Sequence, residues 1–311
     1  MMPTGILESV IARVDEQQWP THCLYVVATP IGNLGDLGLR AWQALLRVDL
    51  IAAEDTRTTR PLLQAWGIGT PVRALHRHNE AEAAAALIES LHQGQRIALI
   101  SDAGAPAISD PGGRVVHEVR QAGLQVLAIP GPSAVTTALM ASGVTSDAQP
   151  AYVFAGFSPH KKGARQKWFE HWAQQKVPVV FYESPHRLIP SLEDLMLVCG
   201  PDRQLTLCRE LTKRFEQVHT ASLAEMCAWV QADKDRQRGE FVLLIHPQSQ
   251  LLELGVDAQT ERWLAALLTQ LSVRDAVRLA VQVTGLSRQL VYDCALRLRD
   301  ASGTENEPVD E

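Results

Sequence analysis

The chain has 311 residues, more than one compact core usually holds, so its length predicts two domains with room for a small appendage. Hydrophobic residues make up 46% of it and charged residues 21%, a balance that excludes fibrous and wholly disordered proteins. The net charge of -6 gives no general attraction to phosphate, so any binding of nucleic acid has to come from local basic patches.

Location and redox state follow from patterns that the sequence lacks. No run approaches the roughly 18 to 20 apolar residues of a membrane span, and the N-terminus lacks the pattern of a secretion signal, so we expect a cytoplasmic protein. The cysteines are odd in number, widely spaced and without a C-x-x-C pair, which predicts reduced thiols and neither disulfides nor a metal site. They are Cys23, Cys199, Cys208, Cys227 and Cys294.

The first half of the chain predicts a parallel α/β domain over residues 23–145, after an N-terminal extension, 1–22, that contains one amphipathic helix. Short apolar runs alternate with helix-like stretches such as 81–92, and each run continues into a cluster of Gly, Pro, Asp or Ser. This alternation is typical of a parallel sheet covered by helices on both faces. The predicted strands are 24–28, 50–53, 97–100 and 126–129.

A second alternation predicts another α/β domain over residues 150–247, after a hinge-like segment at 143–150. Its predicted strands are 152–155, 179–182, 205–208 and 241–245, with an edge strand at 215–220.

The last part of the chain, 255–301, predicts three short helices that resemble a helix-turn-helix unit. They span 259–270, 273–283 and 288–299, the second beginning after Ser272 with Asp275 as its capping-box partner and the third after Ser287. The charge of this unit is only slightly basic, which favours docking or packing over reading of DNA. The acidic residues 302–311 predict a disordered tail.

Three loops that follow predicted strands of the first domain are candidates for a ligand site, because loop N–H groups and helix N-termini converge at that edge of a parallel sheet. The first loop, 29–36, has neither G-x-G-x-x-G nor G-K-[ST], which argues against NAD and ATP. The second, 101–113, combines small residues with acidic groups that can pair with an ammonium ion. The third, 130–134, is a tight turn in which Ser133 is placed to cap the next helix.

Six strings occur in order along the chain: TPIGNLGD, AAEDTR, SDAGAPAISDPG, PGPSA, FYESPHR and RELTK. Together they resemble the bacterial ribosomal RNA cytidine 2′-O-methyltransferases, a family of the tetrapyrrole-methylase superfamily, over about residues 23–247. AAEDTR, RELTK and the stretch from His76 to Glu80 favour this family over relatives that methylate porphyrin-like rings. Two positions depart from its usual pattern: Ala105 replaces a threonine, and Ser158 stands where leucine is common, a change expected to be neutral.

The resemblance implies two tetrapyrrole-methylase-type α/β domains with a cleft for S-adenosylmethionine between them. It implies a homodimer that methylates the ribose 2′-hydroxyl of cytidine 1402 in 16S ribosomal RNA of the small subunit. Carried over by position, the cofactor-binding residues are Pro30, Asp102, Gly104, Ala105, Ile108, Ser133 and Ala134 from the first domain and Tyr182 and Leu211 from the second.

A sulfonium methyl group needs no metal activation, so catalysis reduces to aligning the acceptor oxygen and removing its proton. The candidate bases or orienting groups are Glu54, Asp55, Glu210 and Lys213, with Lys213 and Glu54 preferred. Asp102 is a further candidate, but we expect its side chain to be engaged by the cofactor. Each of these groups, taken alone, is more often an ion-pair partner than a catalyst.

Two basic groups are candidates for binding RNA. Residues 160–167 carry four fixed positive charges and no acid, which predicts phosphate contacts by Lys161, Lys162 and Arg165, although a solvated helix start gives the same pattern. The second group lies near the expected cleft and comprises Arg57, Arg60, Arg73, His76, Arg77 and His78, joined by Arg187 and Arg214. Aromatic residues make up only 5%, which favours recognition of shape and phosphates over base stacking.

Two other functions stay open, because one fold hosts many. A tetrapyrrole C-methyltransferase would use the same cleft with a broad apolar trough and no basic rim. A ligand-sensing regulator would bind DNA through the helical unit at 255–301. The RNA-methylating interpretation expects neither DNA nor membrane as a partner.

Overall fold

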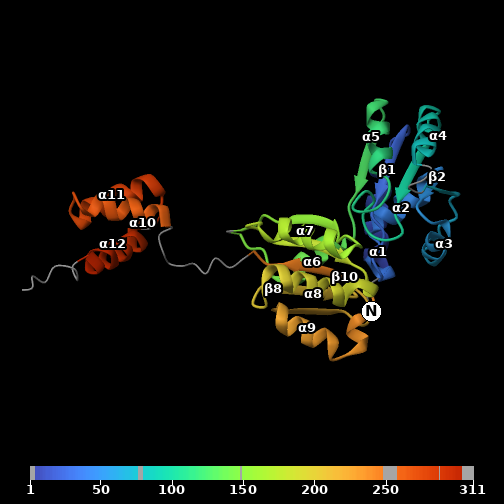
Figure 1. Cartoon of the computed structure of the whole chain (residues 1–311). Coiled ribbons are helices and arrows are strands. Elements are labelled where there is room, and N and C mark those ends of the chain that lie inside the picture. Colours follow the sequence, from blue (N-terminus) through green and yellow to red (C-terminus); the bar gives the residue numbers. More distant parts are fainter. Residues whose placement is uncertain (1–3, 76–79, 148, 248–257, 287, 303–311) are drawn as a thin grey trace, which may run out of the picture. The chain divides into compact units, whose positions relative to one another are not determined.

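The computed structural model describes residues 4–75, 80–147, 149–247, 258–286 and 288–302. The chain divides into two compact units, Met1–Gln248 and Ser249–Glu311, which are described separately. The first holds two β-sheets with their helices and the second a group of helices (Figure 1). The predicted fold class, α/β with a small helical unit after it, is confirmed.

The first sheet is parallel throughout, with strand order β3-β2-β4-β1-β5. Its strands are β1 (Cys23–Val27), β2 (Leu50–Ala53), β3 (Val72–Ala74), β4 (Arg96–Ile100) and β5 (Gln125–Ile129). The four predicted strands agree to within a residue at either end. We did not predict β3, because three residues with an exposed Arg73 at the centre form no apolar run.

Alternate residues of these strands enter two different cores, so helices cover both faces of the sheet. Tyr25 and Ile51 pack with α2 (Leu39–Arg47) and α3 (Thr56–Ala65), whereas Leu24 and Ile97 pack with α4 (Glu80–His92) and α5 (Gly113–Gln121). The N-terminal helix α1 (Thr4–Asp15) lies against α2, and its last residue, Asp15, pairs with Arg47 at 2.5 Å.

The second sheet is mixed, with strand order β6-β7-β10-β8-β9. β6 and β7 are parallel, and every other neighbouring pair is antiparallel. The strands are β6 (Val153–Phe157), β7 (Val179–Glu183), β8 (Gln204–Arg209), β9 (Gln217–Ser222) and β10 (Phe241–Ile245). The predicted edge strand is therefore present as β9, two residues further along the chain.

Helices also cover both faces of this sheet. One core joins it to α7 (Lys162–Ala173), α8 (Leu188–Cys199) and α9 (Leu223–Gln231), while α6 (Ala134–Ser142) buries Val135 and Ala138 against the other face. Helix α6 follows the last strand of the first sheet in the chain but packs on the second. It therefore ties the two halves of the unit together.

The second unit contains α10 (Ala258–Leu268), α11 (Val273–Thr284) and α12 (Arg288–Ser302) around a shared core. Ser272 caps α11 as predicted: the Asp275 N–H donates to its Oγ at 3.2 Å, and the hydroxyl donates to the Asp275 carboxylate at 2.8 Å. Ser287 and residues 303–311 of the expected tail lie outside the described residues.

Membrane-spanning helices, metal sites and disulfides can be looked for in the part of the chain that the structure describes. Within it, no helix is both long and apolar enough to cross a membrane, and no group of three His, Cys, Asp or Glu residues is placed to hold a metal. All five cysteines are free thiols.

Candidate active site

A cavity of about 360 Å³ lies between the two sheets of the first unit. Its lining from the first half of the unit is Ile31, Asp102, Ala103, Gly104, Ala105, Ile108, Asp110, Ser133 and Ala134. Its lining from the second half is Phe157, Tyr182, Glu183, Ser184, Pro185, Leu211, Glu240, Phe241 and Val242. The three predicted strand-end loops thus converge on one cavity, as the parallel sheet requires.

Backbone contacts hold these loops together. Thr29 and Gly104 exchange two backbone hydrogen bonds, of 2.9 and 3.0 Å, which join the first loop to the second. Gly104 has a φ of +77°, and a Cβ there would lie 3.3 Å from Ile31. A Cβ at Gly131 in the third loop would lie 3.1 Å from the Ala28 carbonyl oxygen at the end of β1. Glycine is therefore required where these loops approach each other and the strand.

Two turns beside the cavity hold non-glycine residues at positive φ. Ala107 and Ser109 in the second loop both have φ +69°, and Glu210 and Thr212 after β8 have φ +52° and +65°. Such conformations cost of order 1–3 kcal/mol each and persist where the surroundings impose them. Both turns contribute residues to the cavity wall, so the strain lies where the chain shapes the site.

Eight of the nine residues predicted to bind the cofactor line this cavity: Asp102, Gly104, Ala105, Ile108, Ser133, Ala134, Tyr182 and Leu211. Pro30, the ninth, is buried beside Ile31 and is not among the lining residues. Ser133 occupies the N-cap position of α6 as predicted, but its side chain makes no capping hydrogen bond. Its backbone carbonyl instead accepts from the hydroxyls of Thr136 and Thr137.

Sequence reasoning missed the aromatic neighbours of Tyr182 and a buried carboxylate. The Tyr182 ring contacts Phe154 and Phe157 edge-on, with centroids 5.0 and 5.2 Å away, and burial raises the pKa of its phenol to about 12. The carboxylate belongs to Glu183. Phe157 and Glu183 are the last residues of β6 and β7, and Glu183 belongs to the string FYESPHR, so their position at strand ends was a usable signal.

Glu183 anchors a buried polar cluster that bears on two expectations. The Arg187 guanidinium pairs with the Glu183 carboxylate at 2.9 Å and also donates to the Ser158 carbonyl and the Ser184 hydroxyl. Arg187 is therefore engaged by three groups of the protein, which argues against its predicted contact with RNA. Ser158 is buried and donates its hydroxyl to Glu183, so leucine at this position would remove a donor from a buried carboxylate and would not be neutral.

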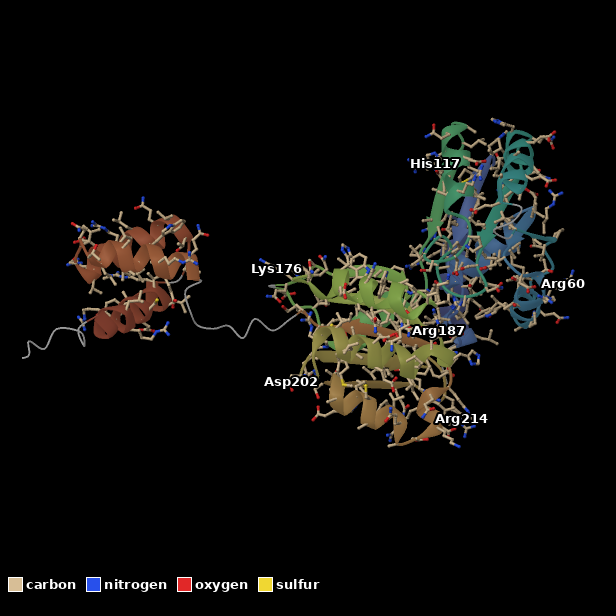
Figure 2. All side chains as sticks on the ribbon, in the orientation of Figure 1. Arg60, His117, Lys176, Arg187, Asp202 and Arg214 are labelled. Carbon is tan, nitrogen blue, oxygen red and sulfur yellow. The ribbon has the colours of Figure 1, made fainter. Side chains whose placement is uncertain are left out.

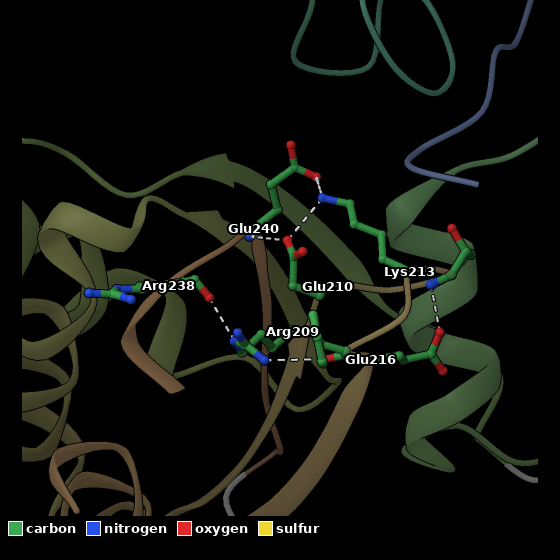
Figure 3. A network of polar contacts seen from close by, with 8 residues as sticks. Arg209, Glu210, Lys213, Glu216, Arg238 and Glu240 are labelled. Carbon is green, nitrogen blue, oxygen red and sulfur yellow. Dashed lines mark hydrogen bonds and ion pairs between the residues drawn. The ribbon is translucent and has the colours of Figure 1, made fainter. Parts of the chain in front are cut away.

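Lys213 and Glu210, two of the proposed catalytic residues, form one ionic cluster with Glu240 (Figure 3). The Lys213 ammonium donates to Glu210 and Glu240, both at 2.9 Å, and the Glu240 N–H also donates to Glu210 at 2.9 Å. The carbons of the Lys213 side chain lie against Gly32 in the first loop, where a Cβ would collide with them. The cluster therefore joins the turn after β8 to both the cavity and the first loop.

The pKa values in this cluster argue for a stable ion pair. Burial alone would lower the pKa of Lys213, but the two carboxylates outweigh it and raise that pKa above the ordinary value. Burial alone would raise the pKa of Glu210, but Lys213 and the Glu240 N–H outweigh it and lower that pKa. An ammonium is no proton acceptor, so this arrangement gives Lys213 the role of a fixed positive charge.

Glu54 and Asp55 lie in a second hollow, of about 330 Å³, at the ends of β2 and β3. Thr56, Arg57, Ala74 and Asp102 complete its lining. Asp55 is the N-cap of α3, and its carboxylate accepts hydrogen bonds from the Arg57 backbone and guanidinium, at 2.6 to 3.1 Å. These bonds lower the pKa of Asp55 to about 2, which makes it a weak base. Arg57 itself is 89% exposed and stands at the rim.

The predicted phosphate-binding segment is only partly available to RNA. Arg165 is 4% exposed, and its guanidinium donates twice to the Asp194 carboxylate of α8, at 2.5 and 2.9 Å. The prediction that Arg165 contacts RNA was wrong, because its position on the inner face of α7 makes it part of a buried ion pair. Lys161 and Lys162 are exposed, as is Lys167 on the same helix. His76 and His78 lie outside the described residues.

Comparisons with known proteins agree with this geometry. Residues 23–227 match the family model of the tetrapyrrole (corrin/porphyrin) methylases, and residues 255–299 match that of the RsmI C-terminal HTH domain. Cobalt precorrin-4 methyltransferase shares the fold at 12% identity, with a TM-score of 0.55 over 72% of this chain and 94% of that one. Diphthine synthase does so at 14% identity, with a TM-score of 0.58 over 73% and 90%.

Curated relatives are much closer in sequence. Ribosomal RNA small subunit methyltransferase I of Escherichia coli O157:H7 is 44% identical over 88% of this chain and 94% of its own length. The protein of that name from Pseudomonas aeruginosa is 42% identical over 90% and 98%. The chain belongs to the tetrapyrrole methylases and, within them, to the family of ribosomal RNA small subunit methyltransferase I.

Proposed function

We propose that this protein transfers a methyl group from S-adenosylmethionine to the ribose 2′-hydroxyl of a cytidine, cytidine 1402, in 16S ribosomal RNA of the small subunit. The observation that supports it most is the coincidence of eight family-implied cofactor residues in one cavity of a chain with relatives of that name. We propose further that the protein acts in the cytoplasm, where small subunits mature, and as a homodimer, the commonest assembly of soluble enzymes.

The cavity suits S-adenosylmethionine chemically. Backbone and small residues on one side let a ligand approach closely, because Gly104 presents no side chain, while Ile108, Leu211 and Phe157 offer apolar surface for an adenine ring. Asp110 supplies negative charge for the amino group and the sulfonium ion. When bound, the donor supplies an electrophilic methyl group. The protein then has to hold the acceptor oxygen in line and accept its proton.

Recognition of RNA falls to exposed cations near these hollows. Arg57 stands at the rim of the second hollow, and Lys161 and Lys162 begin α7 beyond β6, the strand that ends with the cavity residue Phe157. Because these groups are exposed and the whole chain is acidic, the expected binding is local and depends strongly on salt. The ion pairs that Arg165 and Arg187 form within the protein argue against a part for them in this binding.

A methyl-transfer assay tests the function directly. The purified chain is expected to transfer tritiated methyl from S-adenosylmethionine to small ribosomal subunits that lack the modification, with the label in a 2′-O-methylcytidine after digestion. Transfer to a tetrapyrrole and none to ribosomal RNA would support the C-methyltransferase instead. Salt-dependent binding of duplex DNA without any methyl transfer would support the regulator. Light scattering at micromolar concentration tests the dimer.

A further inference from the structure

The cavity and the second hollow meet at one side chain. Asp102 lines both, while Gly104 and Ile108 of the same loop line only the cavity and Asp55 and Arg57 line only the hollow. If the cavity holds the methyl donor, the acceptor has to approach from an adjoining space that opens to solvent. The second hollow is such a space, and its volume lies within the range of small-molecule sites.

The protein fixes Asp102 at this junction. It follows β4 directly, after the buried Ser101, whose hydroxyl donates to the Ala103 carbonyl at 3.2 Å. The Asp55 backbone N–H donates to Asp102 Oδ1 at 3.0 Å, which ties the carboxylate to the start of α3. The end of β2 and the end of β4 thereby hold one carboxylate between two binding spaces.

Among the candidate bases, Asp102 is the one that lines both spaces. Burial raises its pKa, and although the Asp55 N–H and Arg57 work in the opposite direction, the net shift is upward. Asp55 is a weaker base because its bonds to Arg57 lower its pKa. The Glu210 carboxylate is held in an ion pair with Lys213, which lowers its pKa as well. Lys213 itself is an ammonium and has no free electron pair to accept a proton. A base must reach the proton first and match its pKa second, so the position of Asp102 between the two spaces carries the assignment and its raised pKa supports it.

We infer that the second hollow receives the acceptor nucleoside and that Asp102 is the catalytic base that takes the proton of its 2′-hydroxyl. The inference rests on the proposed function, and it assigns the proton transfer to Asp102, which the family resemblance implied as a cofactor ligand. The 2′-oxygen forms its bond to the methyl carbon as the carbon–sulfur bond breaks, its electron pair remaining on sulfur. The hydroxyl proton passes to an Asp102 carboxylate oxygen and then to solvent.

The chemistry of the hollow favours a nucleoside with an exocyclic amino group. Glu54 places a carboxylate there, and carboxylates accept hydrogen bonds from the amino group of cytosine. The exposed Arg57 guanidinium at the rim suits a phosphate oxygen of the RNA backbone. The hollow that contains Asp102 thus also offers one partner for the base and one for the backbone.

The test compares Asp102→Asn and Asp102→Glu with Asp110→Asn, whose carboxylate lines the cavity but not the hollow. Asparagine keeps the size of the side chain and an oxygen for the Asp55 N–H. Three quantities are measured on the full chain: affinity for S-adenosylhomocysteine by calorimetry, affinity for unmodified small subunits by filter binding, and the single-turnover rate at saturating donor and acceptor.

We expect Asp102→Asn to lower the saturated rate by about 100-fold or more, with both affinities within about threefold of the parent. Asp102→Glu keeps a carboxylate, so it should turn over faster than Asp102→Asn; the reverse order would overturn the inference. Asp110→Asn should weaken donor binding and keep most of the saturated rate. The inference also fails if extra donor restores Asp102→Asn, because Asp102 would then be a donor ligand, or if Asp110→Asn loses as much rate.

Other charged groups face Asp102, and the control separates their effect. Glu54, Asp55 and Arg57 lie in the hollow, and Asp110, Glu183 and Glu240 lie around the cavity. A rate loss that followed the total charge would appear in both asparagine variants. Absence of methyl transfer by the parent protein to ribosomal RNA would contradict the proposed function itself, whatever the variants do.

Discussion

The two halves of the first unit contribute different material to the same cavity. The parallel sheet provides backbone and small side chains, such as Ala103, Gly104 and Ala134, on loops locked by Thr29 and by glycine contacts. The mixed sheet provides bulk and charge, such as Tyr182, which contacts two phenylalanine rings, and Glu183, which forms an ion pair with Arg187. We therefore expect larger side chains to disrupt the cavity wall of the parallel sheet. The wall of the mixed sheet should be disrupted by the loss of ion-pair or hydrogen-bond partners.

The largest effect is expected in the framework of the mixed sheet, where Arg165 and Asp194 form a buried pair. Arg165→Ala leaves the Asp194 carboxylate buried and unpaired, which should lower the free energy of unfolding by about 3–5 kcal/mol. Replacing both residues with Met and Leu should recover most of that loss, since a buried ion pair is often no more stabilising than apolar packing. Urea unfolding of the three proteins measures both values.

A result of the opposite kind would contradict the assignment of Arg165 to the interior. Arg165→Ala would then keep the parental stability and bind small subunits less well, as first predicted from the sequence.

On the side of the parallel sheet, a larger side chain in a loop should block ligand binding. Gly104→Leu places a side chain at φ +77° into the cavity and against Ile31, so affinity for S-adenosylhomocysteine should fall by at least about 100-fold, or roughly 3 kcal/mol. Gly163→Leu is the matched control, because a Cβ at Gly163 on α7 meets no atom within 4 Å. Calorimetry showing equal affinities for the two variants would remove the second loop from the site.

The ionic cluster of the mixed sheet should affect rate more than binding. Lys213→Met keeps the packing against Gly32 but removes the positive charge, and we expect the single-turnover rate to fall by about 10- to 100-fold with both affinities retained. Turnover at the parental rate would show that Lys213 has no part in catalysis.

The pH dependence checks the same cluster. The Glu210 pKa is lowered, so its contribution to stability is present above the ordinary value of 4.5 and is lost as pH falls through the folded value. The Lys213 pKa is raised, so its contribution is complete below the ordinary value of 10.5 and is lost as pH rises through the folded value. Lys213 therefore stays an ammonium between pH 7 and 9. Over this range we expect no rise in the parental rate that is missing in Lys213→Met. A rise shown by the parent alone would identify Lys213 as the base.

The smallest effect is expected at the surface of the mixed sheet. Replacing Lys161, Lys162 and Lys167 with alanine should reduce the slope of log affinity for small subunits against log salt by up to roughly 3, one for each lost phosphate contact. Lys176→Ala, an exposed lysine beyond the far end of α7 (Figure 2), is the control and should leave the slope unchanged. An unchanged slope in the triple variant would make this segment a solvated helix start.

The sequence predicted the sheets better than the uses of its charged residues. Apolar runs such as 241–245 located strands because burial on both faces leaves a continuous hydrophobic signal, which the three-residue β3 lacks. Arg165 and Arg187 looked like free cations because their partners, Asp194 and Glu183, meet them only through folding. The family resemblance located the cavity, but the placement of Asp102 between two spaces depends on β2 lying beside β4.

The turn after β8 has a consequence for anyone who tries to make this protein more heat-resistant. Glycine at Thr212, φ +65°, would relieve a backbone conformation that costs of order 1 kcal/mol or more, so a screen for melting temperature should favour Thr212→Gly. The same change loosens the segment that places Leu211 in the cavity wall and Lys213 in the ionic cluster. We therefore expect heat-selected variants at this turn to melt later and turn over more slowly, a trade-off to be checked by scoring both properties in one library.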